Sequence, residues 1–218
     1  MTTETHPLVT ILDAAAMGRF PVSDGNVEVF PPDAHGTRAV VALSGHAYVL
    51  ADVTPAALDQ ALPEPGTGGF GGALHPDVLR WLADSGEGDR HIGTVDVVLV
   101  ARGVGGAAAE AVRLDDGVAE HPRVQRALGH RRDVAVVVEP DGVAVIGCGL
   151  VGRRELSVEL FDTATASAGA GRALIASGLR CVPAGAWCWA QVAPGNARSL
   201  RAFLSCGFTP IGAEVLIT

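Results

Sequence analysis

The sequence contains no lysine, and all 16 of its basic side chains, in 218 residues, are arginines. Without a lysine there is neither a Schiff-base nucleophile nor the phosphate-binding lysine of a P-loop. The arginine bias, with abundant alanine, glycine and valine, is typical of a high-GC bacterial genome. The excluded chemistries therefore include lysine-dependent covalent catalysis and P-loop nucleotide hydrolysis.

Long hydrophobic runs are also missing, because no stretch approaches the roughly 18–20 apolar residues that span a bilayer. The segment Met1–Pro7 has neither the basic start nor the apolar core of a secretory signal. With 48% apolar and 18% charged residues, the composition is that of a globular protein. A net charge of -8 argues against a nucleic-acid partner. We expect a cytoplasmic protein with no membrane and no nucleic-acid partner.

Cysteine and histidine are present without the spacing of a metal site. The four cysteines form no C-x-x-C pair and are interpreted as reduced, small apolar residues: Cys148, Cys181, Cys188 and Cys206. The seven histidines show no H-x-x-x-H pattern, and two of them, in His75-Pro76 and His121-Pro122, are typical of helix starts. No G-x-S-x-G elbow is present. We expect no metal.

The apolar periodicity predicts alternating strands and helices. Strands are predicted at 38–43 and 46–53 as a hairpin turning at Ser44-Gly45-His46, and at 95–101, 133–139, 143–151, 154–161, 186–192 and 212–217. Helices are predicted at 55–62, 76–86, 107–113, 122–130, 171–178 and 197–206. The fold class is therefore mixed α/β, an antiparallel meander that passes into a β-α-β-α-β half.

Two domains are predicted, a hairpin-and-helix region at 1–93 and a second domain at 94–218. A degenerate copy of the second domain's architecture is an alternative interpretation of the first 93 residues. The loop Gly66–Gly72 separates two predicted helices of the first region and is rich in glycine.

Gly169 and Gly171 lie between a strand and a helix, where backbone N–H groups can bind an anion. A dinucleotide fingerprint would need a third glycine at the position of Leu174, so a Rossmann interpretation fails.

The chain from about Thr94 onward resembles the GNAT superfamily of acyl-CoA-dependent N-acyltransferases. The loop 166–171 is similar to that family's Gln/Arg-x-x-Gly-x-Gly/Ala pattern, with Ala166 at the Gln/Arg position. The family's later motif, Asn-x-x-Ser/Ala-x-x-x-Tyr-x-x-x-Gly-Phe, is matched in spacing by Asn196, Ser199, Phe203, Gly207 and Phe208. Phe203 occupies the tyrosine position.

The resemblance implies a central, mostly antiparallel sheet with flanking helices, whose fourth and fifth strands splay apart to accept pantetheine. It implies transfer of an acetyl or other acyl group from CoA to an amine of a small molecule or peptide, by a monomer or homodimer, with acetyl-CoA as co-substrate. The cofactor-binding residues it implies are Leu160, Phe161, Ala168, Gly169, Ala170, Gly171, Arg172, Ala173, Asn196, Ser199 and Phe203. For Asn196, a plain helix N-cap is the alternative.

Glu155, Ser157 and Glu159 alternate along one strand and share a face. Acids on an apolar strand are costly to bury unless they are paired or functional. By the resemblance Glu155 is the general base that deprotonates the amine, and Glu159 shares this role or raises its neighbour's pKa. The alternative is that both carboxylates pair with arginines at a solvated sheet edge, namely Arg132, Arg153 or Arg154.

Because Ala166 and Phe203 depart from the family pattern, two other functions stay open. One is an enzyme of the same fold with different chemistry, and the other is a non-catalytic binding domain.

Overall fold

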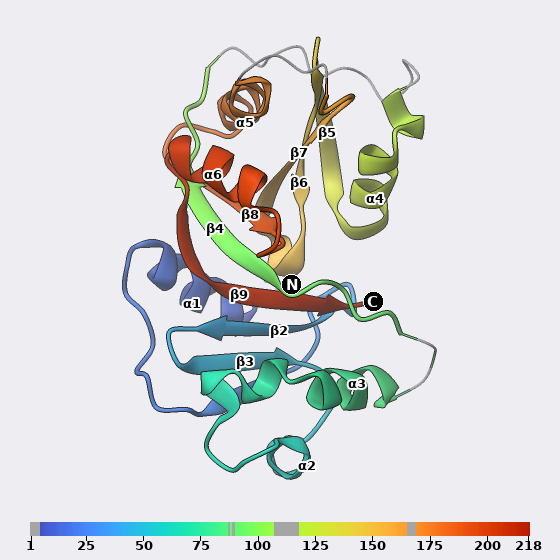
Figure 1. Ribbon diagram of the computed structural model, residues 1–218. Coiled ribbons are helices and arrows are strands. Elements are labelled where there is room, and N and C mark those ends of the chain that lie inside the picture. Colours follow the sequence, from blue (N-terminus) through green and yellow to red (C-terminus); the bar gives the residue numbers. More distant parts are fainter. Residues whose placement is uncertain (1–4, 87, 89, 107–117, 165–168) are drawn as a thin grey trace. The chain divides into compact units, whose positions relative to one another are not determined.

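The computed structural model describes residues 5–86, 88, 90–106, 118–164 and 169–218. The chain has a mixed α/β fold, as predicted (Figure 1). Its helices are α1 (Pro7–Ala16), α2 (Pro55–Ala61), α3 (Pro76–Asp84), α4 (Pro122–His130), α5 (Ala170–Arg180) and α6 (Ala197–Ser205). Its strands are β1 (Val27–Phe30), β2 (Arg38–Leu43), β3 (His46–Leu50), β4 (Asp96–Arg102), β5 (Arg132–Glu139), β6 (Gly142–Cys148), β7 (Arg154–Leu160), β8 (Trp187–Val192) and β9 (Thr209–Ile217).

The chain forms two compact units, residues 1–98 with 211–218, and residues 99–210. In the first unit the strand order is β1-β3-β2-β9. The β2–β3 hairpin turns at Ser44-Gly45, where both residues have positive φ angles of 49° and 87°. Such a pair of angles is the two-residue turn that matches the twist of antiparallel strands. Strand β9 pairs antiparallel with β2, so the C-terminal residues complete this sheet.

One hydrophobic cluster of the first unit lies between a sheet face and two helices. Val40, Val49 and Val215 belong to the same buried cluster as Leu58 of α2 and Leu82 of α3. A buried arginine anchors the end of α3 to this sheet, because Arg38 of β2 donates to the Leu82 carbonyl at 3.2 Å and also contacts the Ser85 carbonyl. These contacts satisfy carbonyls at the helix C-terminus, where a cation is favoured.

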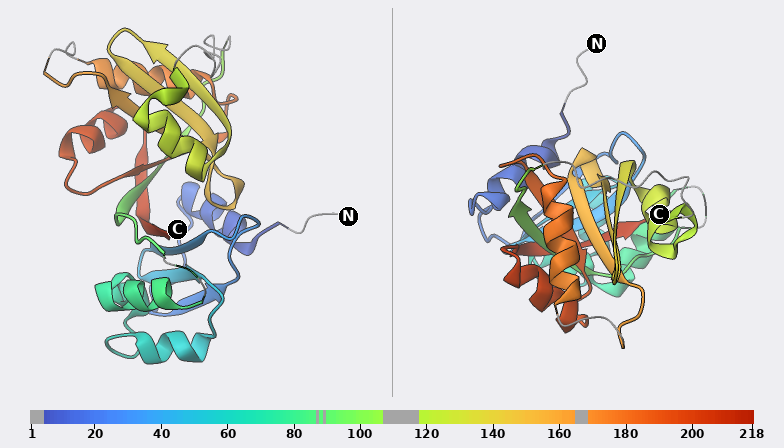
Figure 2. Two further views of the ribbon diagram at one scale, coloured as in Figure 1. Left: turned by 90° about the vertical axis from the view of Figure 1, so that its right-hand side faces the viewer. Right: turned by 90° about the horizontal axis from the view of Figure 1, so that it is seen from above.

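The second unit is built on the antiparallel meander β5-β6-β7, and its strand order is β4-β8-β7-β6-β5. Val143 and Val145 pair in register with Glu159 and Ser157, so these side chains share one face. That face is covered by α4, whose Val124 and Ala127 pack on Val143 and Val145 in one buried cluster. In the left view of Figure 2, α4 lies in front of these strands.

The opposite face of the meander is covered by α5, which lies on the other side of the strands from α4 (Figure 1). The close approach depends on a helical glycine, because a Cβ at Gly178 would lie 3.0 Å from Cδ2 of Leu156 and closer still to Cδ1. Leu156 is buried on β7. The two helices thus fix β7 from both faces, one at its polar side and one at its apolar side.

Three helices begin with the same dipeptide, His-Pro. In each, the Nδ1 atom of the histidine accepts a hydrogen bond from the backbone N–H two residues later, at 3.2 Å in α1, 3.3 Å in α3 and 3.2 Å in α4. Proline at the first helical position has its φ angle already set for the helix. The two predicted histidine helix starts, His75-Pro76 and His121-Pro122, are confirmed, and His6-Pro7 follows the same rule.

The predicted hairpin, the meander and the helices near 55, 76, 122, 171 and 197 are confirmed, with ends that differ by at most three residues. The sequence interpretation missed α1 and β1. The predicted helix at 107–113 lies outside the described residues. The predicted domains, 1–93 and 94–218, and the interpretation of the first as a degenerate copy stay predictions.

We expect Gly178→Val to destabilise the protein by about 1–3 kcal/mol, because the added methyl groups must displace the buried Leu156 side chain. Thermal unfolding measures the effect. The control is Gly171→Ala in the same helix, where an added Cβ meets nothing within 4 Å. Equal melting temperatures for Gly178→Val and the parent protein would contradict this account of the α5–β7 contact.

Candidate functional site

The polar residues predicted on β7 lie on the face that α4 covers. Ser157 and Glu159 are opposite Val145 and Val143 of β6, and Glu155 is opposite Gly147. An added Cβ at Gly147 would crowd the backbone of Arg132. An added Cβ at Gly149 would clash with the Glu155 carboxylate. The absence of side chains at these glycines thus leaves room for Glu155 within a buried layer.

Strands β7 and β8 are parallel but pair at a single position, Glu155↔Trp189. Both strands lie wholly within the described residues, and no further pair joins them beyond this point. By contrast, β6 and β7 pair from Gly142↔Leu160 to Cys148↔Arg154. The facing backbone edges of β7 after Glu155 and of β8 after Trp189 are therefore not satisfied by each other. Strand edges of this kind accept an extended ligand.

Glu155 is only 4% exposed and lies between two guanidinium groups. The Nε of Arg131 donates to its Oε2 at 2.9 Å, and the Nε of Arg153 donates to its Oε1 at 2.8 Å. Burial alone would raise the pKa of this carboxyl group, but the charges of Arg153 and Arg131 outweigh burial and hold the pKa below its ordinary value of 4.5. Glu155 is thus an ionised carboxylate with both oxygens occupied.

These contacts favour the ion-pair alternative for Glu155, and its role as a general base stays a prediction. One expected partner, Arg153, is present, whereas Arg131 was not among the expected arginines. The charged groups are also buried rather than at a solvated edge, because the side chains of Arg131 and Arg153 are only 11% and 4% exposed. A buried charge of this kind is retained only when it is paired and hydrogen-bonded.

Glu159 pairs with Arg123 of α4 at 2.8 Å, and both side chains are about one-third exposed, at 38% and 34%. The arginines expected as partners, Arg132, Arg153 and Arg154, are not involved in this contact. The pair joins the first turn of α4 to β7. Its catalytic role likewise stays a prediction.

Sequence reasoning missed both Arg123 and Arg131, of which Arg131 makes the larger set of contacts. Its guanidinium donates from Nε to Glu155, from Nη1 to Ser157 Oγ at 3.0 Å, and from Nη2 to Gln191 Oε1 of β8 at 3.5 Å. The available signal was an arginine directly after a predicted helix and before a meander that carries same-face polar residues. Sequence alone does not show which of Arg131 and Arg132 faces inward.

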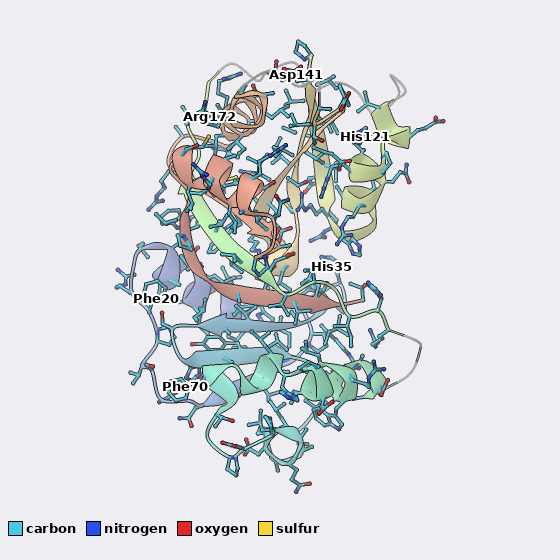
Figure 3. All side chains as sticks on the ribbon, viewed as in Figure 1. Phe20, His35, Phe70, His121, Asp141 and Arg172 are labelled. Carbon is cyan, nitrogen blue, oxygen red and sulfur yellow. The ribbon has the colours of Figure 1, made fainter. Side chains whose placement is uncertain are left out.

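At the start of α5, Gly169 is the N-cap with a φ angle of 98°, which only glycine adopts easily. The cap residue has no side chain and the first turn of α5 carries no acidic residue, so neither supplies a carboxylate to the leading N–H groups. The Arg172 side chain turns back toward Gly169, since a Cβ there would lie 3.3 Å from Arg172 Nη2. Figure 3 shows Arg172 at this helix start. Ala170 is buried, while Arg172 and Ala173 are exposed.

Three other implied cofactor residues lie at the end of β7 or between β7 and α5 in the sequence. Leu160, at the end of β7, is half-buried, and Phe161 is 53% exposed with its ring edge-on to His121 at 5.8 Å. Ala168, together with the loop position Ala166, lies outside the described residues. The cofactor contacts of all of these residues stay predictions.

In the later motif, Asn196 accepts a hydrogen bond from the Ser199 N–H at 3.1 Å and caps α6. The N-cap alternative for Asn196 is therefore the observed arrangement, and the residue is exposed. Phe203 is 3% exposed and packs edge-to-face on Phe208 at 4.9 Å. The motif's spacing thus serves the packing of α6, and ligand contacts by Asn196, Ser199 and Phe203 remain untested.

A second titratable cluster lies in the first unit. The Nδ1 of His46 is 2.8 Å from Asp24 Oδ1, and its Nε2 is 3.3 Å from Glu28 Oε1. Burial, together with Glu28 and Asp24, raises the pKa of the neighbouring Tyr48 to about 12. The cluster joins β1, β3 and the segment before β1. Within it His46 is buried, whereas the side chains of Asp24 and Glu28 are 33% and 55% exposed.

Among the described residues, no group of three or more histidine, cysteine or acidic side chains is arranged to hold a metal ion. Within the same residues, no helix has both the length and the apolar character needed to cross a bilayer.

Comparison with known proteins assigns no family to the chain. No protein-family model matches it, and no curated protein matches it. Among solved structures it is similar to a GCN5-related N-acetyltransferase from Kribbella flavida, with a TM-score of 0.36 and 15% sequence identity. The similarity covers 59% of this chain and 59% of that chain. Any conclusion about function therefore depends on this chain's own geometry.

We expect Glu155→Gln to lower the free energy of unfolding at pH 7 by about 3 kcal/mol, because two buried guanidinium groups lose their counter-charge. The lowered pKa of Glu155 means that the stabilisation is full above pH 4.5 and is lost as the pH falls through the folded-state pKa. Urea unfolding from pH 7 down to pH 3 measures both effects.

The matched control is Glu120→Gln, which changes an exposed glutamate of the same unit. It should leave stability within about 0.5 kcal/mol of the parent protein. If Glu155→Gln were as stable as this control across the pH range, the buried ion pair would not be a stabilising element.

Proposed function

We propose that this protein is an acyltransferase that takes an acyl group from acetyl-CoA, or from another acyl-CoA, and transfers it to an amine of a small molecule or peptide. The observation that carries the proposal is the divergence of β7 and β8 after their single pair, Glu155↔Trp189. The start of α5 supports it, because the loop that follows β7 leads to an uncapped helix N-terminus.

The diverging strands suit the pantetheine arm of CoA. This arm is an extended chain with two amide groups, so it can hydrogen-bond to the free strand edges as an added strand does. The acyl thioester then lies near the level at which β7 and β8 part. Backbone N–H groups on the free edges are donors that can polarise the thioester carbonyl.

The start of α5 suits the pyrophosphate. Leading N–H groups and the helix dipole favour an anion at this end, and the exposed guanidinium of Arg172 adds a positive charge beside Gly169. An 11-residue helix carries a well-developed dipole. The chain has no lysine for this role, so backbone donors and arginine provide the binding.

The reaction is a direct transfer. The neutral amine nitrogen attacks the thioester carbon, the C–S bond breaks, and CoA leaves as the thiolate. The extra proton of the acylated nitrogen then passes to the thiolate or to water. A thiolate is a good leaving group because thiols ionise near pH 8.5, so the absence of a proton donor at Phe203 does not prevent the step. The ammonium form of the acceptor must first lose its proton. Because Glu155 is ion-paired, water in the open site is the simplest acceptor for that proton.

A non-catalytic acyl-CoA-binding domain is the second candidate. It is favoured by the two ion pairs of Glu155 and by the buried, proton-free side chain at Phe203. The two candidates share the cofactor site and differ only in turnover. Acetyl-CoA binding followed by an assay of CoA release with a panel of amines separates them.

We expect acetyl-CoA to bind the parent protein and Ala173→Glu to weaken binding by roughly five- to tenfold. A carboxylate a few ångströms from the pyrophosphate costs on the order of 1 kcal/mol in solvent. The same carboxylate stabilises the first turn of α5, so loss of binding cannot be attributed to unfolding. Isothermal titration calorimetry measures the dissociation constants.

The control is Ala176→Glu, which places the same charge at an exposed site of α5 nearly one turn further from the helix start. It should bind acetyl-CoA nearly as the parent does. Absence of binding to the parent protein at millimolar acetyl-CoA would refute the proposed function. Equal acetyl-CoA affinity of Ala173→Glu and Ala176→Glu would show that the pyrophosphate does not bind at the start of α5.

A further inference from the structure

Arg131 lies where α4 ends, and its backbone N–H donates to the Ala127 carbonyl at 2.7 Å as the helix C-cap. Its side chain is 11% exposed and points into the face of the second unit that carries the polar residues of β7. Arg132, the next residue, is exposed and begins β5. Of these two adjacent arginines, Arg131 is therefore the one whose side chain points into the interior.

The three nitrogens of the Arg131 guanidinium contact two different strands. Nε and Nη1 donate to Glu155 and Ser157 of β7, at 2.9 and 3.0 Å, and Nη2 donates to Gln191 of β8 at 3.5 Å. We call these contacts the Arg131 bridge. Because Glu155 is in register with Trp189, Ser157 and Gln191 stand at the same level, two residues beyond the last backbone pair.

We propose that Arg131 is a positioning residue, which through Ser157 and Gln191 sets the separation of β7 and β8 where their backbone pairing has ended. In terms of the proposed function, on which this role rests, the Arg131 bridge fixes the width of the opening that receives the acyl thioester. It joins the two strands by side chains and leaves their facing backbone edges to the ligand.

The planar guanidinium group is suited to this role. It presents donors in a rigid fork, so the bonds to Ser157 and Gln191 also fix the angle between the strands. A lysine would keep the positive charge beside Glu155 but offers no planar fork that reaches both strands. Arg153 donates to the opposite oxygen of Glu155 at 2.8 Å and supplies the second positive charge beside this carboxylate.

The test compares Arg131→Lys with its neighbour's substitution, Arg132→Lys. Hydrogen exchange followed by mass spectrometry measures the protection of β7 and β8 in the absence of any ligand. We expect amide exchange in 156–160 and 190–192 to accelerate about tenfold in Arg131→Lys and to be unchanged in Arg132→Lys. Gln191→Leu removes only the β8 contact and serves as a milder second variant if Arg131→Lys folds poorly.

Acetyl-CoA titration gives the second measurement. We expect the dissociation constant to rise about fivefold in Arg131→Lys and in Gln191→Leu, whereas Arg132→Lys binds as the parent does. With an amine substrate, the loss should fall on the KM for acetyl-CoA more than on kcat, because the bridge positions the thioester and takes no proton.

The outcomes separate the bridge from the proposed function. Unchanged exchange in both Arg131→Lys and Gln191→Leu overturns the bridge whatever the ligand result. Faster exchange with unchanged acetyl-CoA affinity overturns its positioning role. If the parent protein fails to bind acetyl-CoA while exchange in Arg131→Lys still accelerates, the proposed function fails and the structural bridge stands.

Discussion

The buried carboxylate of Glu155 is the interaction on which the second unit's candidate site depends. An ionised carboxyl group at this depth is stable only because two guanidinium groups meet its two oxygens. One of these guanidinium groups comes from the end of α4 and the other from the turn before β7. The charge therefore holds together the helix, the turn and the strand, and through Gln191 it reaches β8 as well. The place where the strands part is organised around one carboxylate and its two ion pairs.

This arrangement changes how the polar stripe of β7 is understood. On the sequence alone, alternating acids on an apolar strand indicate catalysis or a solvated edge. In the structure Glu155 is ion-paired with Arg131 where β7 and β8 part. Glu159 is ion-paired with Arg123 and joins α4 to β7 at a partly exposed position. The proposed ligand contacts are instead backbone edges and the start of α5, and of these only the start of α5 has a sequence signal, Gly169 and Gly171.

Local pattern was sufficient for most of the fold. The Ser44-Gly45 turn, the Pro122 helix start and the Pro140-Asp141 turn each carry a short-range signal that fixes one element. Strand β1, with only four residues, has too little alternation to be recognised and is defined by its pairing with β3. Partners such as Arg131 and Arg123 could not be assigned, because they depend on how α4 crosses the meander. Phe203 and Asn196 match a motif in spacing, while their observed contacts are packing and capping.

The three His-Pro helix starts have a shared consequence for the imidazole rings. In α1, α3 and α4 the cap is the Nδ1 atom, which offers its lone pair to a backbone N–H. An imidazole that accepts at Nδ1 carries its ring hydrogen on Nε2. In α1 this hydrogen has a partner, because His6 Nε2 lies 3.1 Å from the Pro31 carbonyl oxygen. Each cap therefore fixes a ring tautomer as well as a helix start, with one nitrogen accepting inside the helix and the other available as a donor outside it.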